Sequence, residues 1–312
     1  MSLARALELA AAAAGRAYPN PTVGAVVVSG GEVVGEGATE EHGARHGEVV
    51  ALDAAGDRAR GATLYVTMEP CTHHGRTPPC VDRIVAAGVA RVVAGSRDPN
   101  PDAAGGLERL RAAGVDVELA DVPAARRQNE AWRTWVALRR PFVTYKAAVT
   151  LDGRVAVPGS RWVTGPEARR RVHELRAQSD AVAVGAGTFR ADAPRLDARD
   201  VPVVRQPRRL VFGRGPLPEG SELELVSGPL DDALARLGRE GVQSLLLEGG
   251  PTLGTAFLRA DLVDKLLLFV APRLAGTGAA WVGALDVPLD LGGLHAEAVG
   301  GDVLLEAYVH EP

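Results

Sequence analysis

Short apolar runs rich in β-branched residues alternate with segments of helical periodicity throughout the first half of the chain. The runs predict strands at residues 23–28, 32–38, 63–68, 91–96 and 115–119. Helices are predicted from His46 to Ala55, from Cys80 onward and near Leu107. This alternation is typical of a layered α/β domain.

The first twenty residues contain an Ala-rich run that could be mistaken for a signal peptide. We predict an amphipathic helix instead, because the run contains Glu8 and leads directly into Pro19-Asn20-Pro21. The chain has no run of about 18 apolar residues, so no membrane span is expected. We expect a cytoplasmic protein, in which the two cysteines stay reduced and can bind metal.

A break in the pattern divides the chain into two domains. A helix is predicted from about Pro123 to Leu138, and Pro141 stops it before a new strand begins. We therefore place the domains at residues 1–140 and 141–312, both of ordinary domain length.

The second domain continues the alternation. Its predicted strands lie at residues 142–149, 180–185, 208–213, 244–250, 264–272 and 302–309, with helices at 231–240 and 252–260. Thr164-Gly-Pro-Glu167 predicts a capping box that opens a further helix, which ends near Gln178. Residues 190–206 have little periodicity, and a long loop in a compact domain is typically functional.

The charge balance argues against a broad nucleic-acid surface. Residues 1–140 carry 16 Arg and no Lys against 17 acidic residues, and the remainder carries 19 basic against 22 acidic residues. The resulting net charges, −1 and −3, indicate no basic face in either half. Aromatic residues make up only 4% of the chain, which leaves little material for base-stacking platforms.

Two segments carry the pattern of a zinc-dependent deaminase, His46-Gly-Glu48 and Pro70-Cys71 followed by Cys80. Zinc accepts imidazole nitrogen and thiolate sulfur in a tetrahedral site, and a catalytic site keeps the fourth position for water. His46, Cys71 and Cys80 supply three ligands. Glu48 does not ligate, and it is placed to move the proton of the attacking water to the leaving nitrogen.

Two other interpretations stay open at this point. In the first, the two cysteines bind no metal and are simply small apolar residues of the core. In the second, His73 or His74 is a fourth ligand and completes a closed structural zinc site. The joint occurrence of His-x-Glu and Pro-Cys ahead of a second Cys favours the catalytic interpretation. Eight residues separate the cysteines here, whereas two are common in deaminases. This longer spacing restricts the deaminase families to which the chain could belong.

Several longer motifs carry a resemblance that covers nearly the whole chain. In the first half they are Pro19-Asn-Pro-Thr-Val-Gly24 and the loop from Glu69 to Cys80; in the second they are Pro141–Lys146, Leu151–Arg154, Trp162–Gly165 and Glu248–Pro251. The chain resembles the bifunctional deaminase/reductases of riboflavin biosynthesis. The resemblance implies a cytidine-deaminase-like three-layer α/β/α domain followed by a dihydrofolate-reductase-like α/β domain that binds NADPH.

The resemblance also implies site residues. In the first domain, Asn20, His73 and Arg76 match positions that grip the pyrimidine and its ribose phosphate. The positions that contact the coenzyme are Ala148, Trp162, Thr188, Asp192, Gly250, Pro251, Thr252, Leu253, Gly254, Thr255 and Ala256. Those that hold the phosphorylated substrate are Ser160, Arg176, Leu196, Arg199 and Glu248.

Some of these assignments have competing interpretations from the residues alone. A guanidinium group matches a sugar phosphate well, but Arg176 is also typical of a solvated helix face and Arg199 of a loop charge. Asp192 is expected near the hydride-transfer site as a second catalytic residue, although the family pattern has a further Asp or Asn where Ala193 stands. Asn20 and Asp192 also suit ordinary turns.

Glycine patterns in the second half argue against a Rossmann domain. Gly185-Ala-Gly187 follows a strand, but Arg190 occupies the third glycine position of the dinucleotide fingerprint. Gly249-Gly-Pro-Thr252 is the better candidate, because a strand there runs into a helix start whose free N–H groups can hold an anion.

The sequence thus predicts an enzyme that deaminates 2,5-diamino-6-ribosylamino-4(3H)-pyrimidinone 5′-phosphate and then reduces its ribosyl group with NADPH. We expect a homo-oligomer, a dimer or a tetramer, with no nucleic-acid or membrane partner. Two alternatives remain: a deaminase of another small base joined to a different pteridine-like reductase, and a non-catalytic nucleotide-binding protein stabilised by zinc.

Overall fold

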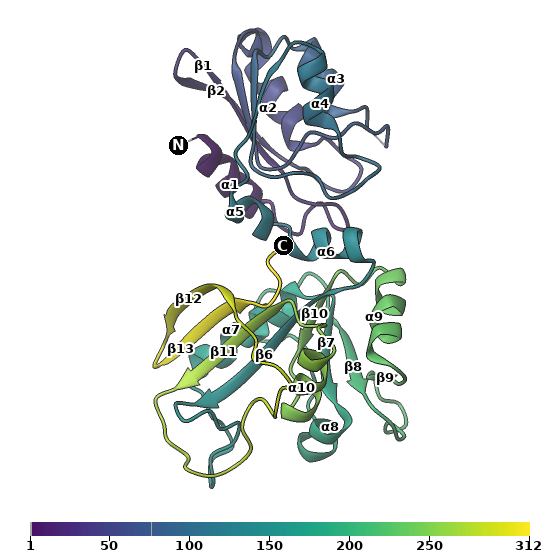
Figure 1. Ribbon diagram of the computed structural model, residues 1–312, viewed down its shortest axis with the longest axis vertical. Coiled ribbons are helices and arrows are strands. Elements are labelled where there is room, and N and C mark those ends of the chain that lie inside the picture. The colour runs from purple at the N-terminus through teal and green to yellow at the C-terminus, as the bar shows by residue number, and fades with distance from the viewer. Residues whose placement is uncertain (1, 76) are drawn as a thin grey trace. The chain divides into compact units, whose positions relative to one another are not determined.

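The computed structural model describes residues 2–75 and 77–312 (Figure 1). The chain separates into two compact units, one ending at Leu138 and the other spanning Arg139–Glu311. Each unit is built on one β-sheet. No helix of the described residues is long and apolar enough to cross a membrane.

The first unit contains a five-stranded sheet in the order β2-β1-β3-β4-β5. Its strands are β1 (Gly24–Ser29), β2 (Glu32–Ala38), β3 (Thr63–Val66), β4 (Arg91–Ala94) and β5 (Asp116–Leu119). β1 is antiparallel to β2 and β3, whereas β3, β4 and β5 are parallel. The parallel strands therefore end at one edge of the sheet, where loops toward the following helices begin.

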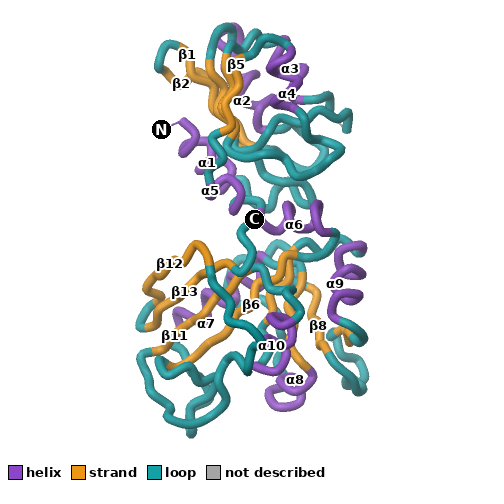
Figure 2. Tube along the Cα trace, in the orientation of Figure 1, coloured by secondary structure: helices purple, strands orange, loops and turns teal. Residues whose placement is uncertain are grey.

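Helices cover both faces of this sheet (Figure 2). One layer holds α2 (Gly47–Ala55), the short 3₁₀ turn η1 (Gly56–Ala59), α3 (Cys80–Ala86) and α4 (Gly106–Ala112); the other holds α1 (Ser2–Ala12) and α5 (Pro123–Arg127). Two glycines allow the close packing. A Cβ atom on Gly37 would lie 2.5 Å from the backbone nitrogen of Ala51 in α2, and one on Gly24 would lie 1.9 Å from the carbonyl oxygen of Ala6 in α1. The unit is therefore a three-layer α/β/α domain.

The second unit contains an eight-stranded sheet in the order β12-β13-β11-β6-β10-β7-β8-β9. Its strands are β6 (Phe142–Thr150), β7 (Ala181–Gly185), β8 (Arg208–Phe212), β9 (Glu224–Val226), β10 (Ser244–Leu247), β11 (Lys265–Ala271), β12 (Gly292–Val299) and β13 (Asp302–Tyr308). Neighbouring strands from β11 to β9 are parallel, whereas β13 is antiparallel to both of its neighbours, β11 and β12.

Helices again pack on both faces of the sheet. α9 (Leu230–Arg239) and α10 (Pro251–Arg259) share a core cluster with Tyr145 and Leu247. α7 (Pro166–Gln178) and α8 (Ala186–Asp192) lie against the opposite side chains of the same strands, in smaller clusters. The loops that follow β6, β7, β8 and β10 all leave from the carboxyl edge of this sheet, where open α/β sheets bind ligands.

Most predicted elements are confirmed, including the helices at His46–Ala55 and at Cys80, but the helix predicted from Pro123 to Leu138 is wrong. It is two helices, α5 and α6 (Glu130–Leu138). The interruption includes Asn129, whose side chain accepts a hydrogen bond from the Thr22 N–H at 2.9 Å and donates to the Thr22 carbonyl at 3.0 Å. A tertiary contact thus overrides local helix propensity.

The predicted capping box is also wrong. The N-cap residue of α7 is Gly165, and no side chain caps it. The N–H of Gly165 instead donates to Asp302 at 2.7 Å, from a strand far along the sequence. Four elements were not predicted: the short η1, α8, the three-residue β9, and β12, whose residues are almost all exposed. An edge strand with so little burial lacks the alternation that marks a strand in sequence.

Candidate functional site

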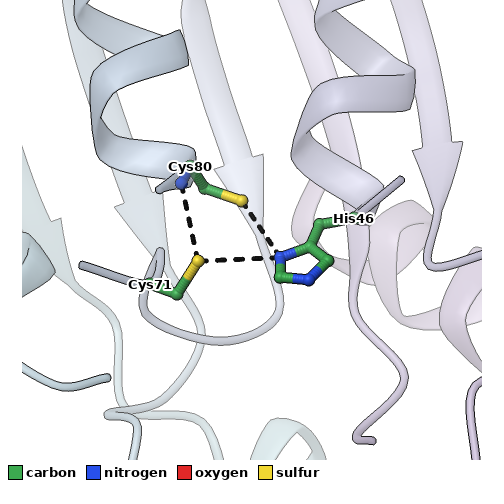
Figure 3. A group of neighbouring side chains, drawn as sticks. All are labelled: His46, Cys71 and Cys80. Carbon is green, nitrogen blue, oxygen red and sulfur yellow. Dashed lines mark hydrogen bonds between the residues drawn. The ribbon is translucent and has the colours of Figure 1, made fainter. Parts of the chain in front are cut away.

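Three potential metal ligands meet at the helix starts of the first unit (Figure 3). His46 precedes the first turn of α2, Cys80 opens α3, and Cys71 lies in the loop after β3. The Nδ1 atom of His46 lies 3.3 Å from the Cys80 sulfur and 3.6 Å from the Cys71 sulfur. All three ligand atoms lie within 4.8 Å of one another.

These distances suit a tetrahedral zinc ion. With bond lengths of about 2.0–2.1 Å to nitrogen and about 2.3 Å to sulfur, neighbouring ligands of a tetrahedron lie roughly 3.6 Å apart. Among the described residues, no fourth His, Cys, Asp or Glu joins the group. His73 and His74 are exposed, so the closed structural site that they would complete is not formed by the described chain. Three protein ligands leave one position open, as in catalytic zinc sites.

Glu48 lies beside this group on the first turn of α2 and is only 3% exposed. Its Oε2 atom is buried and makes no hydrogen bond to any described residue. Burial raises the pKa of Glu48 to about 7, although the neighbouring His46 lowers it. A carboxyl with that pKa can both accept and donate a proton near neutral pH.

The two cysteines differ in their hydrogen bonding. The Cys80 backbone N–H points to the Cys71 sulfur at 3.5 Å. The hydrogen bond from the Cys80 thiol is the largest of the effects that lower the pKa of Cys71 to about 4, and this contact between the two sulfurs raises the pKa of Cys80. Cys71 therefore has thiolate character, which is the form that binds metal.

Two further predicted residues of the first domain, Asn20 and His73, lie on its surface. Asn20 and His73 are exposed, and the N–H of Asn20 donates to the Ala17 carbonyl at 2.8 Å. Arg76 lies outside the described residues. The competing turn interpretation of Asn20 thus agrees with its backbone, and its exposed position leaves substrate binding a prediction.

A buried group of charges lies in the second unit. Arg176 on α7 donates to Glu248 through Nε at 2.5 Å and Nη2 at 3.0 Å. The Nζ atom of Lys146 on β6 lies 3.6 Å from the same carboxylate. The solvated helix face suggested for Arg176 is therefore wrong, because its side chain is only 12% exposed.

Lys146 was not singled out in the sequence, yet it is one of only two lysines in the chain, the other being Lys265. Burial lowers the pKa of Lys146, and Glu248 opposes that shift. Burial alone would raise the pKa of Glu248, but Lys146 and Arg176 together hold it below its ordinary value. The signal that could have identified Lys146 is a lone cation in the middle of an apolar strand.

The strand-to-helix turn at Gly250 meets a neighbouring turn of the sheet. Gly250 is the N-cap of α10, and its N–H donates to the Thr188 hydroxyl of α8 at 3.2 Å. A Cβ atom on Gly185 would lie 3.4 Å from Leu253. Thr188 and the start of the 250–256 segment are thus brought together, as expected for parts of one ligand site.

Within that segment, two residues face the core. A Cβ atom on Gly254 would lie 2.2 Å from the Tyr145 ring, and the Thr255 hydroxyl accepts the Gly283 N–H at 2.7 Å. These two residues would therefore either contact a ligand through their backbone atoms or act indirectly, by packing that holds the start of α10 in place.

A cavity of about 440 Å³ lies at the carboxyl ends of β8 and β9. Leu253 forms part of its wall, so the cavity adjoins the start of α10, and Arg214 and Ser227 supply polar groups. Arg208 and Arg209, by contrast, form ion pairs with Glu224 and Glu222. Arg214 is thus the arginine of this region that lines the cavity.

Three other predicted residues lie on β6 or in the loop that follows it. Trp162 is 49% exposed between Arg161 and Arg169, and Ser160 accepts a hydrogen bond from Arg273 at 3.3 Å. Ala148 lies on β6, beside Phe269 of β11.

The last three predicted residues lie at the end of α8 and in the segment that follows it. Asp192, the final residue of α8, is exposed. Leu196 is 1% exposed and has a φ of 57°, which is uncommon for a leucine. Arg199 pairs with Asp197 at 2.5 Å and keeps 42% of its side chain exposed. Non-glycine residues in left-handed conformation often cluster at functional segments.

Comparison with known proteins assigns both halves. Residues 2–96 match the cytidine and deoxycytidylate deaminase zinc-binding region, and residues 141–305 match the RibD C-terminal domain. The riboflavin biosynthesis protein RibD of Aquifex aeolicus is 40% identical over 317 residues, covering 90% of this chain and 89% of that protein. RibD of Escherichia coli is 40% identical over 324 residues, covering 89% and 88%.

Solved structures agree with this assignment over nearly the full length. Acinetobacter baumannii RibD superposes with a TM-score of 0.87 at 34% identity, covering 98% of this chain and 97% of that one. A Thermotoga maritima deaminase/reductase gives a TM-score of 0.84 at 34% identity, with the same coverage. This chain therefore belongs to the RibD family, the bifunctional deaminases and reductases of riboflavin biosynthesis, with a zinc-binding cytidine-deaminase-like domain followed by a dihydrofolate-reductase-like domain.

Proposed function

We propose that residues 1–140 remove the 2-amino group of 2,5-diamino-6-ribosylamino-4(3H)-pyrimidinone 5′-phosphate, and that residues 141–312 then reduce the ribosyl group with NADPH. The product is 5-amino-6-ribitylamino-uracil 5′-phosphate. The Thermotoga maritima relative is described as a diaminohydroxyphosphoribosylaminopyrimidine deaminase and 5-amino-6-(5-phosphoribosylamino)uracil reductase, which supports this substrate class.

The observation that carries the first step is the buried Glu48 beside the three metal ligands, with one carboxylate oxygen unpartnered among the described residues. His46, Cys71 and Cys80 would hold zinc, which when bound supplies Lewis acidity and makes water nucleophilic near neutral pH. Glu48 takes the proton of the attacking water and delivers it to the amino nitrogen, which leaves as ammonia while C2 gains an oxygen. Asn20, His73 and Arg76 would bind the pyrimidine and the ribose phosphate.

For the second step, NADPH would lie along the carboxyl edge of the second sheet. Ala148, Trp162, Thr188, Asp192 and the segment from Gly250 to Ala256 would contact it, and the bound coenzyme would supply the hydride that reduces C1′ of the ribosyl group. Asp192 is exposed at the end of α8, where it could orient the sugar or move a proton. Arg214 in the neighbouring cavity would bind the 2′-phosphate that distinguishes NADPH from NADH.

The phosphorylated substrate would be held by Ser160, Arg176, Leu196, Arg199 and Glu248. Arg199 is the most accessible cation of this set, because Arg176 is already engaged by Glu248. The Leu196 side chain is buried, so its contribution would come through the backbone. A small-molecule substrate suits both halves, and we further propose that the enzyme works as a cytoplasmic dimer or tetramer.

The decisive experiment supplies zinc-loaded protein with the diamino-ribosylamino-pyrimidinone phosphate, with and without NADPH, and follows ammonia release and NADPH oxidation together. Ammonia released without NADPH, followed by NADPH consumption that depends on the deaminated product, is the expected result. Ammonia without any NADPH consumption would contradict the second step. The absence of both signals from folded, metal-replete protein would contradict the substrate assignment.

A further inference from the structure

Glu69 is a buried carboxylate at the start of the Glu69–Cys80 motif, and the proposed reaction gives it no role. Its side chain has 0% exposure, and its nearest cation, Arg97, remains 3.8 Å away. The carboxylate instead accepts three backbone N–H groups, those of Asp98 at 3.2 Å, Gly105 at 3.1 Å and Leu107 at 3.1 Å. Burying a carboxylate carries a desolvation cost, which here is offset mainly by the three peptide N–H groups, with Arg97 adding a longer ion pair. The segment that donates these N–H groups shows what the carboxylate holds in place.

All three donors belong to one segment, residues 98–107, which links β4 to α4. The same segment grips the chain on the other side of Cys71. The Thr72 N–H donates to the Ala103 carbonyl at 3.0 Å, and the Thr72 hydroxyl reaches the carbonyls of Ala103 and Ala104 at 3.1 and 3.0 Å. Cys71 is thus flanked by two anchors, Glu69 two residues before it and Thr72 directly after it, that end on one loop.

Packing leaves little freedom between this segment and the cysteine loop. A Cβ atom on Gly106 would lie 1.8 Å from the carbonyl oxygen of Pro70, so the start of α4 packs directly against the residue before Cys71. Ala103 is 2% exposed and shares a small apolar cluster with Cys71 and Cys80. The segment therefore forms a wall behind both sulfur ligands.

We propose that Glu69 is a positioning residue for the metal centre: acting through the 98–107 segment, its carboxylate fixes the backbone that presents the Cys71 sulfur. Groups that hold ligands in place typically change metal affinity by about 10–100-fold when they are removed. The proposal rests on the assignment of His46, Cys71 and Cys80 as zinc ligands.

Glu69→Gln tests the carboxylate with almost no change in shape. One carboxylate oxygen accepts the Asp98 N–H and the other accepts the N–H groups of Gly105 and Leu107. The amide replaces one of these oxygens with an NH₂ donor, so one side loses its acceptor. We expect its zinc affinity, measured by competition with a chromophoric chelator, to fall about 10–100-fold. The visible spectrum of the Co²⁺-substituted protein should also change, because that spectrum reports ligand geometry directly.

Thr72 gives an independent test on the other side of Cys71. Thr72→Val removes the hydroxyl that reaches Ala103 and Ala104, whereas Thr72→Ser keeps it. We expect weaker zinc binding in Thr72→Val and restoration of wild-type affinity in Thr72→Ser. This pair keeps the inference testable even if Glu69→Gln does not fold.

Val93→Ala serves as the control for general destabilisation. Val93 is 6% exposed on β4, and strand alternation places it on the face opposite Val92 and the α2–α4 layer. It should lose stability while keeping wild-type zinc affinity and a wild-type Co²⁺ spectrum. Wild-type affinity and spectrum in both Glu69→Gln and Thr72→Val would overturn the inference. Failure of the unaltered protein to bind zinc would instead overturn the ligand assignment, so the two failures are distinguishable.

Discussion

Arg176 and Glu248 form a two-pronged ion pair across the second domain, with N–O distances of 2.5 and 3.0 Å and side chains only 12% and 9% exposed. The pair joins α7 to the end of β10, and Lys146 approaches the same carboxylate from β6. Two cations, Arg176 and Lys146, therefore share the one carboxylate of Glu248 at the edge of the sheet where the substrate is proposed to bind.

Removing the carboxylate from this group should be costly. Glu248→Gln leaves Arg176 and Lys146 buried without their counter-charge, and the free energy of unfolding should fall by about 3–5 kcal/mol. The measurement is chemical denaturation of the full chain. Arg170→Ala is the matched control on the same helix, because Arg170 pairs with Glu174 at the surface with 68% of its side chain exposed. Equal losses in the two variants would contradict the burial argument.

Glu48→Gln should separate zinc binding from catalysis. The amide has nearly the same shape but cannot carry the proton, so deamination should fall by about 10²–10⁴-fold while zinc content stays unchanged. Ammonia release and metal analysis measure the two effects. Glu41→Gln, an exposed acid ahead of His46, should behave like the unaltered protein. Full deaminase activity in Glu48→Gln would contradict the proposed role of Glu48. If the unaltered protein binds zinc and is stabilised by it but releases no ammonia, the site is structural and the catalytic proposal is wrong.

Arg199→Ala should weaken the phosphorylated substrate more than NADPH. Arg199 keeps an accessible guanidinium group, and a hydrogen bond to a charged group contributes about 1.5–3 kcal/mol, which corresponds to roughly 10–150-fold in KM. Arg195→Ala is the control, because Arg195 pairs with the same Asp197 but is 74% exposed. Steady-state kinetics of the reductase step measures both constants. Equal losses for substrate and coenzyme would remove Arg199 from the phosphate site.

Arg214→Ala should reduce the preference for NADPH over NADH. Arg214 lines the cavity beside the start of α10, so its removal should raise the KM for NADPH by about 10-fold or more and leave the KM for NADH unchanged. Arg209→Ala, which loses a surface pair with Glu222, should not change the ratio. A parallel rise for both coenzymes would show that Arg214 does not distinguish the 2′-phosphate.

Tyr145 should make stability depend on pH in the alkaline range. Burial raises the pKa of Tyr145 to about 12, and its hydroxyl donates to the Trp281 carbonyl at 2.7 Å. Because the folded state favours the neutral phenol, this contribution is fully present below the unfolded pKa of about 10 and is lost as pH rises through 12.

The test compares the unaltered protein with Tyr145→Phe by denaturation at several alkaline pH values. The difference in unfolding free energy should be largest below pH 10 and should shrink toward pH 12. Difference absorbance should assign the late-ionising phenol to Tyr145. A phenol that ionises near pH 10 in the folded protein would contradict this account.

The deaminase half could be predicted closely from sequence because its signals are local. His46 and Glu48 lie within one helical turn, and Cys80 opens the next helix, so short motifs fix which side chains face each other. Cys71 joins them through a loop whose Pro-Cys pattern was recognisable. Glu69, by contrast, accepts its hydrogen bonds from residues 98–107. That contact forms because β3 and β4 are neighbours in the sheet, which local sequence does not reveal.

The reductase half depends more on contacts between distant segments. The Lys146–Glu248 pair exists because β6 and β10 are neighbours in the sheet, which neither strand's own sequence reveals. The end of α8 and the exposed β12 lacked a hydrophobic period. One boundary in the deaminase half also depends on a distant contact, because the break before α6 includes Asn129, which is hydrogen-bonded to Thr22 more than a hundred residues away.

The two lysines give the folded chain an unusual response to amine-directed chemistry. Lys146 and Lys265 lie on adjacent strands, each with only 13% of its side chain exposed and each paired with a glutamate. An acylating reagent therefore finds its lysine targets inside the second sheet, whereas most proteins present them on their surface. The extent of acylation at each lysine, measured by mass spectrometry, should consequently report how often the sheet opens locally around that residue.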